Sequence, residues 1–270
     1  MTQESGDTMQ RDIFSLHEKV VLITGGSGHL GSAMSEGLLQ YGAKLYIASR
    51  NQEKNAEYAR YLSDKYNRKV FQIYLDTTDA NSVQKAVEEI LLIEGKIDVL
   101  INNSYSGTSG DILSVSESDW LKTFDGSIHS TYRLIQEVLP SMIKEKSGSI
   151  INIASMYGIV SPNPDIYGES GQNNPPHYGA SKAAIIQFSK YLAGHYGKDG
   201  IRVNAISPGP FPNDTTQQNQ KFIQELANKN PLGRIGKPEE LKGIVILLAS
   251  EAGSYITGQN ISVDGGWTTW

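Results

Sequence analysis

The chain has 270 residues, a formal net charge of −5 and no cysteine. Its acidic balance argues against a nucleic-acid partner, because binding a phosphate backbone requires clustered Lys and Arg. The absence of cysteine excludes disulfides and thiolate nucleophiles, and the five histidines follow no metal-ligand spacing, so no metal is expected. Met1–Gln10 does not resemble a signal peptide, and the apolar runs are too short to span a bilayer. We therefore expect a cytoplasmic protein with no membrane partner.

Short, β-branched apolar runs alternate with longer segments of helical periodicity. Runs that are almost wholly apolar are typical of strands buried on both faces of a parallel sheet. The alternation predicts an α/β fold with a single doubly wound parallel sheet (Rossmann fold) and helices on both faces. The expected strands are Val20–Thr24, Leu45–Ala48, Val70–Leu75, Val99–Asn102, Ile150–Ala154, Val203–Ile206 and Ile261–Val263, and the expected helices span residues 29–41, 52–67, 79–94, 116–143, 177–197, 217–229 and 238–249.

The chain shows no linker that would divide it into two domains. Residues 1–16 are expected to form an N-terminal arm and residues 17–270 the dinucleotide-binding domain. Residues 161–176 are rich in Pro, Gly, Asn and Ser, which indicates a loop. Such long loops inside a compact domain are uncommon and often functional, so we interpret this one as a wall or lid of the substrate pocket. The alternative is an excursion into solvent.

A glycine-rich segment joins the first expected strand to the first expected helix. Gly26, Gly28 and Gly31 form the pattern G-x-G-x-x-G between a strand and a helix, the context in which this pattern binds a dinucleotide. Glycine allows a tight turn and lets the backbone approach a pyrophosphate at the positive end of the helix. The alternative is an ordinary glycine-rich turn. The residues expected to contact the dinucleotide here are Gly25, Ser27, His29 and Leu30.

Ser49 and Arg50 follow the second expected strand. An acid at this place would bind the adenosine ribose diol of NAD, whereas Arg can pair with the 2′-phosphate of NADP. The pair favours NADP as the cofactor, and NAD remains possible. The alternative is a surface Arg50 that stacks on adenine or faces water.

Ser155, Tyr178 and Lys182 form the candidate catalytic group. Tyr178 and Lys182 are four residues apart, so they lie on one face of a helix. A free phenol has a pKa near 10, and a neighbouring ammonium favours the phenolate, which a base that removes an alcohol proton requires. By itself this pair is common by chance. Its position after the fifth strand, in a chain with a dinucleotide turn, gives it weight.

Together these motifs resemble the classical short-chain dehydrogenase/reductase family. The resemblance covers nearly everything after residue 16, in the family's order. The matching segments are Val20–Gly25, Leu75–Thr77, Ile101–Asn103, Asn152–Ser155, Tyr178–Lys182, Ile201–Gly209, Thr257–Gln259 and Val263–Gly266.

The resemblance implies an enzyme that transfers a hydride between NAD(P)(H) and a secondary alcohol or ketone. Tyr178 would be the acid/base, Lys182 would lower its pKa and bind the nicotinamide ribose, and Ser155 would hydrogen-bond the substrate oxygen. Family members usually form homotetramers or dimers, and Trp267 and Trp270 are placed for a subunit contact or for covering their own core. The remaining residues implied to bind cofactor are Asp76, Thr77, Asn103, Pro208, Gly209 and Phe211.

Four positions depart from the family pattern. His29 replaces the middle glycine of the turn. Ser127 lies where the family has a catalytic Asn that holds a water for proton relay, which leaves the relay in doubt. Ser155 and Tyr178 are 23 residues apart, about ten more than usual, and the surplus falls in the loop 161–176. Asn213 replaces a Thr that often meets the nicotinamide carboxamide.

The polar composition of the loop and the family's habits favour a sugar, polyol or sugar acid as the small-molecule substrate, as in gluconate 5-dehydrogenase-like members. One alternative is a dinucleotide-binding sensor with weak or no catalysis, which Ser127 alone suggests. Another is a nucleotide-sugar epimerase or dehydratase, suggested by the position of Gly28. Such enzymes usually carry a larger C-terminal substrate domain, which is not expected after Val263–Gly266 here.

Overall fold

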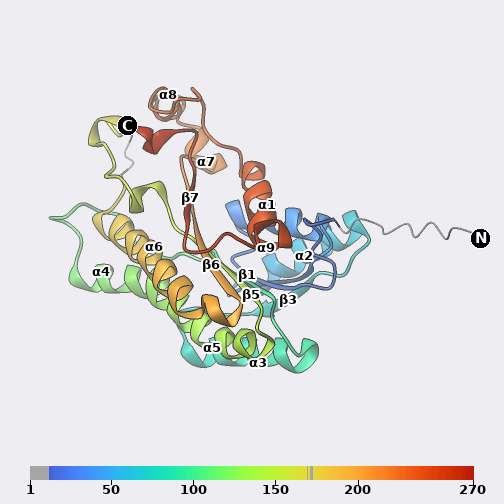
Figure 1. Cartoon of the computed structure of the whole chain (residues 1–270). Helices are drawn as coiled ribbons and strands as arrows, with labels where there is room; N and C mark the ends of the chain where they lie inside the picture. Colours follow the sequence, from blue (N-terminus) through green and yellow to red (C-terminus); the bar gives the residue numbers. More distant parts are fainter. Residues whose placement is uncertain (1–11, 169, 171–172) are drawn as a thin grey trace, which may run out of the picture.

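The computed structural model describes residues 12–168, 170 and 173–270. Seven parallel strands form one sheet in the order β3-β2-β1-β4-β5-β6-β7 (Figure 1). Since β1 lies between β2 and β4, the chain reverses its direction of winding there, and a ligand crevice is expected outside the carboxyl ends of the strands at this point. The strands are β1 (Val20–Thr24), β2 (Lys44–Ser49), β3 (Phe71–Tyr74), β4 (Val99–Asn102), β5 (Gly148–Ile153), β6 (Ile201–Pro208) and β7 (Asn260–Val263).

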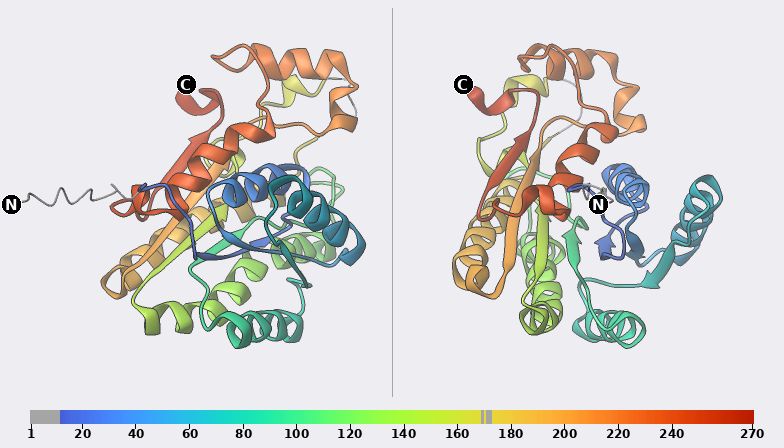
Figure 2. Two further views of the ribbon diagram at one scale, coloured as in Figure 1. Left: turned by 90° about the vertical axis from the view of Figure 1, so that its right-hand side faces the viewer. Right: turned by 45° about the vertical axis from the view of Figure 1, so that its right-hand side comes forward.

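Helices cover both faces of the sheet, each over its own apolar core. One core packs α1 (His29–Gln40), α2 (Gln52–Tyr66) and α9 (Lys242–Ala249) against the sheet. The other packs α3 (Ala80–Glu94), α5 (Ser130–Glu145) and α6 (Pro176–Tyr196) against the opposite face. Figures 1 and 2 show the second group together, on the far side of the sheet from α1 and α9. The doubly wound fold predicted from the sequence is confirmed.

Two expected helices are interrupted. The segment expected to be helical over 116–143 begins as α4 (Glu117–Phe124), passes through a π-helical turn at Asp125–His129 and continues as α5. The segment expected over 217–229 is two short helices, α7 (Asp214–Gln217) and α8 (Gln220–Asn228). Periodicity alone misses such breaks, because a π turn adds one residue without ending the apolar face.

The segment 12–16, at the end of the expected arm, is held by the domain. The side chain of Leu16 is fully buried, and its backbone N–H donates to the carbonyl of Tyr41 at 2.8 Å. Residues 1–11 of the expected arm lie outside the described residues.

A third, smaller apolar cluster lies beyond the carboxyl ends of β5 and β6. It joins Met156, Ile166, Phe222, Leu226 and Trp267, which are far apart in the sequence. Figure 1 shows α8 near the C-terminal end of the chain, apart from the two helical layers. Trp267 therefore covers its own core, whereas Trp270 is 82% exposed.

Candidate active site

A cavity of about 640 Å³ opens at the carboxyl ends of β1, β2 and β4. Its floor is the glycine-rich turn, where Gly25 has a φ of 63°. A Cβ added to Gly31 would lie 2.0 Å from the carbonyl oxygen of Gly25, so only glycine allows the turn to pack this closely against α1. α1 begins after Gly28 without a side-chain cap, which leaves its first amides available to an anion.

Polar groups from β2 and β3 line the adenosine end of this cavity. Ser49, Arg50, Asp76, Thr77 and Thr78 all contribute to it. The carboxylate of Asp76 accepts hydrogen bonds from the amide and hydroxyl of Thr78, at 2.9 and 2.7 Å. Burial works to raise the pKa of Asp76, but these hydrogen bonds and the charge of Arg50 lower it overall. Arg50 is exposed, as a residue that meets a ligand phosphate at the rim requires.

Asn103 ties the end of β4 to the end of β1. Its side-chain amide donates to the carbonyls of Thr24 and Gly25, and its backbone N–H donates to the Thr24 hydroxyl. The residue also lines the cavity. Asn103 thereby fixes the shape of the glycine turn, a role that its position at a strand end did not reveal.

Of the residues expected to contact the dinucleotide in this turn, Ser27 does not line the cavity and His29 does. Ser27 is buried and donates to Asn55 at 2.7 Å, and it is not among the residues that line the cavity. The hydroxyl of Ser27 therefore holds α2 to the turn, and the contact of Ser27 with the dinucleotide stays a prediction. His29 lines the cavity, and its Nε2 lies 3.0 Å from the carbonyl oxygen of Phe211. Leu30 and Gly25 also line the cavity.

Ser155, Tyr178 and Lys182 come together where β5 ends and α6 begins. Ser155 hydrogen-bonds Tyr178. The Ser155 hydroxyl also accepts from the backbone N–H of Tyr157 at 3.2 Å, which fixes its orientation. Lys182 Nζ donates to the carbonyl of Ile153 at 2.8 Å and lies 5.7 Å from the centroid of the Tyr178 ring. A hydroxyl pair beside a buried ammonium suits proton exchange with a substrate oxygen.

Burial dominates the acidity of both titrating groups. Burial lowers the pKa of Lys182 to about 8, below the ordinary value for an ammonium. Burial raises the pKa of the Tyr178 phenol, and the hydrogen bond from Ser155 opposes the rise. The lowering of the Tyr178 pKa by Lys182 that the spacing predicts is not seen here, because Nζ is directed to the carbonyl of Ile153 rather than to the phenol oxygen. Tyr178 is therefore protonated near neutral pH and ready to act as an acid.

Ser127 lies in the π-helical turn between α4 and α5. It is 1% exposed, and its Oγ has no hydrogen-bond partner within the described part of the chain. The hydroxyls of Ser130 and Thr131 both donate to its carbonyl, which stabilises the turn. A buried hydroxyl without a protein partner is suited to hold a water, so the relay role of Ser127 stays a prediction.

A second cavity, of about 240 Å³, lies beside Ser155 and Tyr178. Gly209 and Phe211 line it, whereas Pro208 lies at the buried end of β6. The loop 161–176 contributes Tyr167, which stacks on Phe222 of α8 with ring centroids 5.9 Å apart. The further lining residues include Met156, Tyr157, Asn173, Asn174, Pro210, Pro212, Thr216, Phe222 and Leu226. The walls are therefore mostly aromatic and aliphatic, which the polar composition of the loop did not predict.

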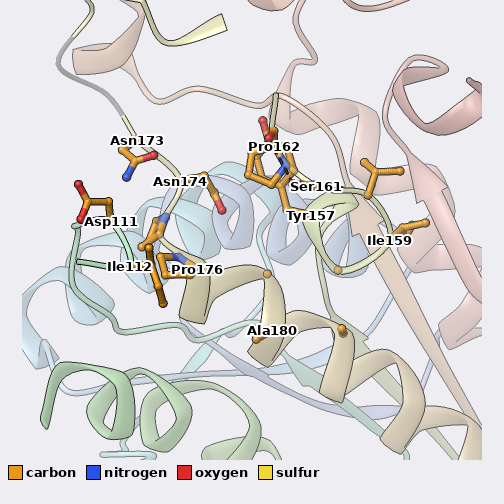
Figure 3. A pocket seen from close by; sticks show the side chains of 15 residues that line it. Asp111, Ile112, Tyr157, Ile159, Ser161, Pro162, Asn173, Asn174, Pro176 and Ala180 are labelled. Atoms are coloured by element: carbon orange, nitrogen blue, oxygen red, sulfur yellow. Dashed lines mark hydrogen bonds between the residues drawn. The ribbon is translucent and has the colours of Figure 1, made fainter. Parts of the chain in front are cut away.

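A third cavity, of about 510 Å³, lies on the other side of Tyr157. Figure 3 shows Asn173 and Asn174 on one side of it and Ser161 and Pro162 on the other, above the first turns of α6. Tyr157, Asn173 and Asn174 line both this cavity and the one beside Tyr178. Asn173 and Asn174 of this loop, with Tyr157, thus separate the two cavities.

Tyr105 is a site residue that the sequence interpretation missed. It lines the dinucleotide cavity, and its ring meets the ring of Tyr178 edge-on with centroids 5.1 Å apart. Lys182 Nζ lies 5.4 Å from the centroid of the Tyr105 ring. Burial and the neighbouring Tyr178 raise the pKa of Tyr105 to about 12, so it stays protonated. An aromatic residue just after the polar end of a strand, at Asn103-Ser104, was the available signal.

Within the described ranges no helix has the length and apolar character to cross a bilayer. The same residues contain no cluster of three His, Cys, Asp or Glu that could hold a metal.

Comparison with known proteins was informative along nearly the whole chain. Residues 27–268 match the family model described as enoyl-(acyl carrier protein) reductase. The chain is 37% identical over 252 residues to a 3-oxoacyl-[acyl-carrier-protein] reductase of Chlamydia muridarum, covering 93% of this chain and 98% of the relative.

Two solved structures share the fold closely. One is a gluconate 5-dehydrogenase from Burkholderia cenocepacia in complex with NADP and tartrate, with a TM-score of 0.87, 29% identity and coverage of 96% of this chain and 98% of that one. The other is an NADPH-dependent 3-quinuclidinone reductase from Rhodotorula rubra, with a TM-score of 0.85, 29% identity and coverage of 100% and 98%.

Proposed function

The chain belongs to the classical short-chain dehydrogenase/reductase family and is an oxidoreductase acting on alcohol or keto groups, and from this we propose that it reduces a ketone, or oxidises the corresponding secondary alcohol, with NADP(H). The observation that carries the proposal is the convergence of Ser155, Tyr178 and Lys182 beside the 240 Å³ cavity, where the Tyr178 ring contacts Tyr105 of the cavity at the glycine-rich turn.

The dinucleotide cavity fits NADP(H). The uncapped start of α1 and the bare glycine turn suit a pyrophosphate. Arg50 supplies a planar cation at the adenosine end, and Ser49 provides no carboxylate that would repel a 2′-phosphate. Two structural neighbours are described as an NADP complex and an NADPH-dependent reductase, which supports the same choice.

The three catalytic groups divide the chemistry of reduction. When bound, the nicotinamide supplies the hydride that the carbonyl carbon receives. Ser155 donates a hydrogen bond to the carbonyl oxygen, and Tyr178 donates its proton to that oxygen as negative charge develops on it. Lys182 lies in the same buried site, and its ammonium stabilises the phenolate that remains once Nζ turns from the carbonyl of Ile153 toward the phenol oxygen. Alcohol oxidation reverses these steps, with Tyr178 as the base.

The substrate class follows from the walls of the 240 Å³ cavity. The neighbour described as a gluconate 5-dehydrogenase favours a sugar acid, as the loop composition did. The rings of Tyr157, Tyr167 and Phe222 favour a less polar ketone, because buried polyol hydroxyls without partners are costly. A carbonyl reductase could act on either a sugar acid or a less polar ketone. The aromatic lining of the cavity favours the less polar ketone.

The decisive experiment is a ketone panel assayed with NADPH and NADH in parallel, on wild type and Tyr178→Phe. We expect kcat to fall at least about a thousandfold in the variant, because general acid catalysis is removed. The dissociation constant of NADPH should change less than about threefold. Tyr255→Phe makes the same change at a fully exposed ring and is the matched control. Undiminished turnover in Tyr178→Phe would refute the assigned acid, and NADPH binding without turnover of any ketone by wild type would favour a sensor.

A further inference from the structure

The cavity beside Tyr178 contains two further phenols. The hydroxyl oxygens of Tyr157 and Tyr167 lie 3.2 Å apart and are hydrogen-bonded, and both residues line this cavity together with Tyr178. Neither hydroxyl has another hydrogen-bond partner among the described residues. Two hydroxyls carry two protons and their mutual bond uses one, so one proton is free to donate to a ligand.

Rigid packing holds this hydroxyl pair in place. Tyr167 stacks on Phe222, and the ring of Tyr157 meets Trp267 edge-on with centroids 6.5 Å apart. Tyr157 is also anchored through its backbone N–H, which donates to the Ser155 hydroxyl. The pair is therefore held in a fixed position relative to Ser155.

The same cavity offers no charge to a ligand. Its described lining residues include no Lys, Arg, His, Asp or Glu. Two basic residues of neighbouring parts of the fold are engaged elsewhere. Lys182 donates to the carbonyl of Ile153, and Arg234, in a neighbouring cavity that Phe211 also lines, pairs with both carboxylate oxygens of Glu240. A carboxylate that entered would lose water without gaining a cation.

We propose that the Tyr157–Tyr167 hydroxyl pair is the specificity element of this enzyme, which binds a second, uncharged oxygen of a ketone whose remainder packs on Phe222 and Leu226. The inference rests on the proposed function and narrows its substrate to neutral oxygenated ketones. Esters, thioesters and amides carry such an oxygen. Free sugar acids bring a charge that no described lining residue neutralises, and polyols bring several hydroxyls to walls that are mostly aromatic and aliphatic, so neither class fits as well.

The test compares three neutral keto esters with their own carboxylates. Ethyl pyruvate, ethyl acetoacetate and ethyl levulinate place the ester at three distances from the ketone. 2-Heptanone lacks the second oxygen, and sorbose is a ketone that carries several hydroxyls. For wild type we expect the best ester to exceed 2-heptanone about tenfold in kcat/KM, the worth of one neutral hydrogen bond. It should exceed its carboxylate at least about a hundredfold, because an unpaired charge is buried.

Removing the two hydroxyls should abolish the preference for the ester over 2-heptanone and leave the preference for the ester over its carboxylate. Tyr157→Phe and Tyr167→Phe each leave one hydroxyl and should reduce the ester preference, and the double variant should bring it to about one. Tyr255→Phe, an exposed phenol, should keep the wild-type ratio. An ester preference that survives in the double variant, or a carboxylate or sorbose preferred by wild type, would overturn the proposal.

A second readout does not depend on turnover. Dimethyl malonate has two neutral ester groups and no ketone, and its dissociation constant for the enzyme with NADP⁺ can be measured by calorimetry. We expect about tenfold weaker binding in the double variant. Equal affinities of wild type and the double variant for dimethyl malonate would refute the proposed role of the hydroxyl pair. A failure of wild type to reduce any ketone would be a separate result, and it would count against the proposed function. Unchanged NADP⁺ affinity in the variant verifies that it is folded.

Discussion

The dinucleotide cavity and the substrate cavity lie on either side of the contact between the Tyr105 and Tyr178 rings, but they are built in different ways. The first is shaped by backbone: Gly31 touches the carbonyl of Gly25, and Asn103 holds two strand ends through main-chain oxygens. The second is shaped by side chains from distant segments, such as the stacked rings of Tyr167 and Phe222. A cavity shaped by backbone tolerates few substitutions. In a cavity shaped by side chains, a substitution can change which ligand binds without moving the backbone.

Gly31→Ala should have the largest effect on cofactor binding, because it changes the backbone turn that shapes the dinucleotide cavity. The added Cβ would meet the Gly25 carbonyl at 2.0 Å, so the turn and the start of α1 must move apart. We expect the NADPH dissociation constant, measured by fluorescence titration, to rise at least about a hundredfold. Gly243→Ala in α9 is the control: nothing lies within 4 Å of its Cβ, and stability should rise by about 0.5–1 kcal/mol. Normal binding by Gly31→Ala would mean that the turn is not the cradle.

Ser49→Asp tests cofactor choice at the end of β2. The new carboxylate would repel a 2′-phosphate beside Arg50, so the ratio of kcat/KM for NADPH over NADH should fall by roughly 10- to 100-fold. Ser49 donates to Asn55 at 2.9 Å, and Ser49→Asn, which matches Asp in shape, separates that lost bond from the charge. If Asn and Asp alter the ratio equally, charge at this position does not select the cofactor.

The same division explains what the sequence could predict. Strand ends, the glycine turn and the Tyr178–Lys182 spacing are local patterns, and β1 and β4 have the predicted bounds. Tyr105, Tyr157 and Tyr167 were missed because their meeting with Tyr178 depends on how separate loops fold over the sheet. Composition misled for a related reason: residues 161–176 are polar overall, yet Tyr167 is the ring that this loop turns toward Phe222.

Of the two cavities, Phe222→Ala should weaken ligand binding only in the substrate cavity. Phe222 is 7% exposed, and its removal frees Tyr167 on one side. We expect KM for the best ketone to rise about tenfold while the NADPH dissociation constant changes less than twofold, with stability lower by about 3 kcal/mol. Phe222→Leu keeps most of the volume and should lie between the variant and wild type. Equal losses in ketone and NADPH binding would show that the two cavities are not separable.

Glu36→Gln probes the scaffold of the dinucleotide side. Burial works to raise the pKa of Glu36, but hydrogen bonds from Lys242, Lys65 and Tyr66 lower it to about 2. The folded pKa is below the unfolded value, so the contribution is present at neutral pH and is lost as pH falls from about 4.5 toward 2. We expect the variant to lose about 1 kcal/mol in urea unfolding at pH 7, a value reduced for solvent screening. The difference from wild type should shrink at pH 3, and a gap that is constant with pH would contradict the linkage.

Ser127→Ala should have the smallest effect. It tests the buried hydroxyl of the π turn that packs against α6. The hydrogen bonds that hold the π turn run to the backbone carbonyl of Ser127, so alanine should leave the turn intact. If the buried hydroxyl holds a relay water, kcat should fall about threefold, the solvent isotope effect should grow and KM should stay unchanged. Ser130→Ala removes a hydrogen bond to the Ser127 carbonyl but keeps the Ser127 hydroxyl, so it shows what loosening the π turn alone does to kcat. Full activity with higher stability would instead mean that Ser127 is only an unsatisfied polar group, since removing such a group from a core is stabilising.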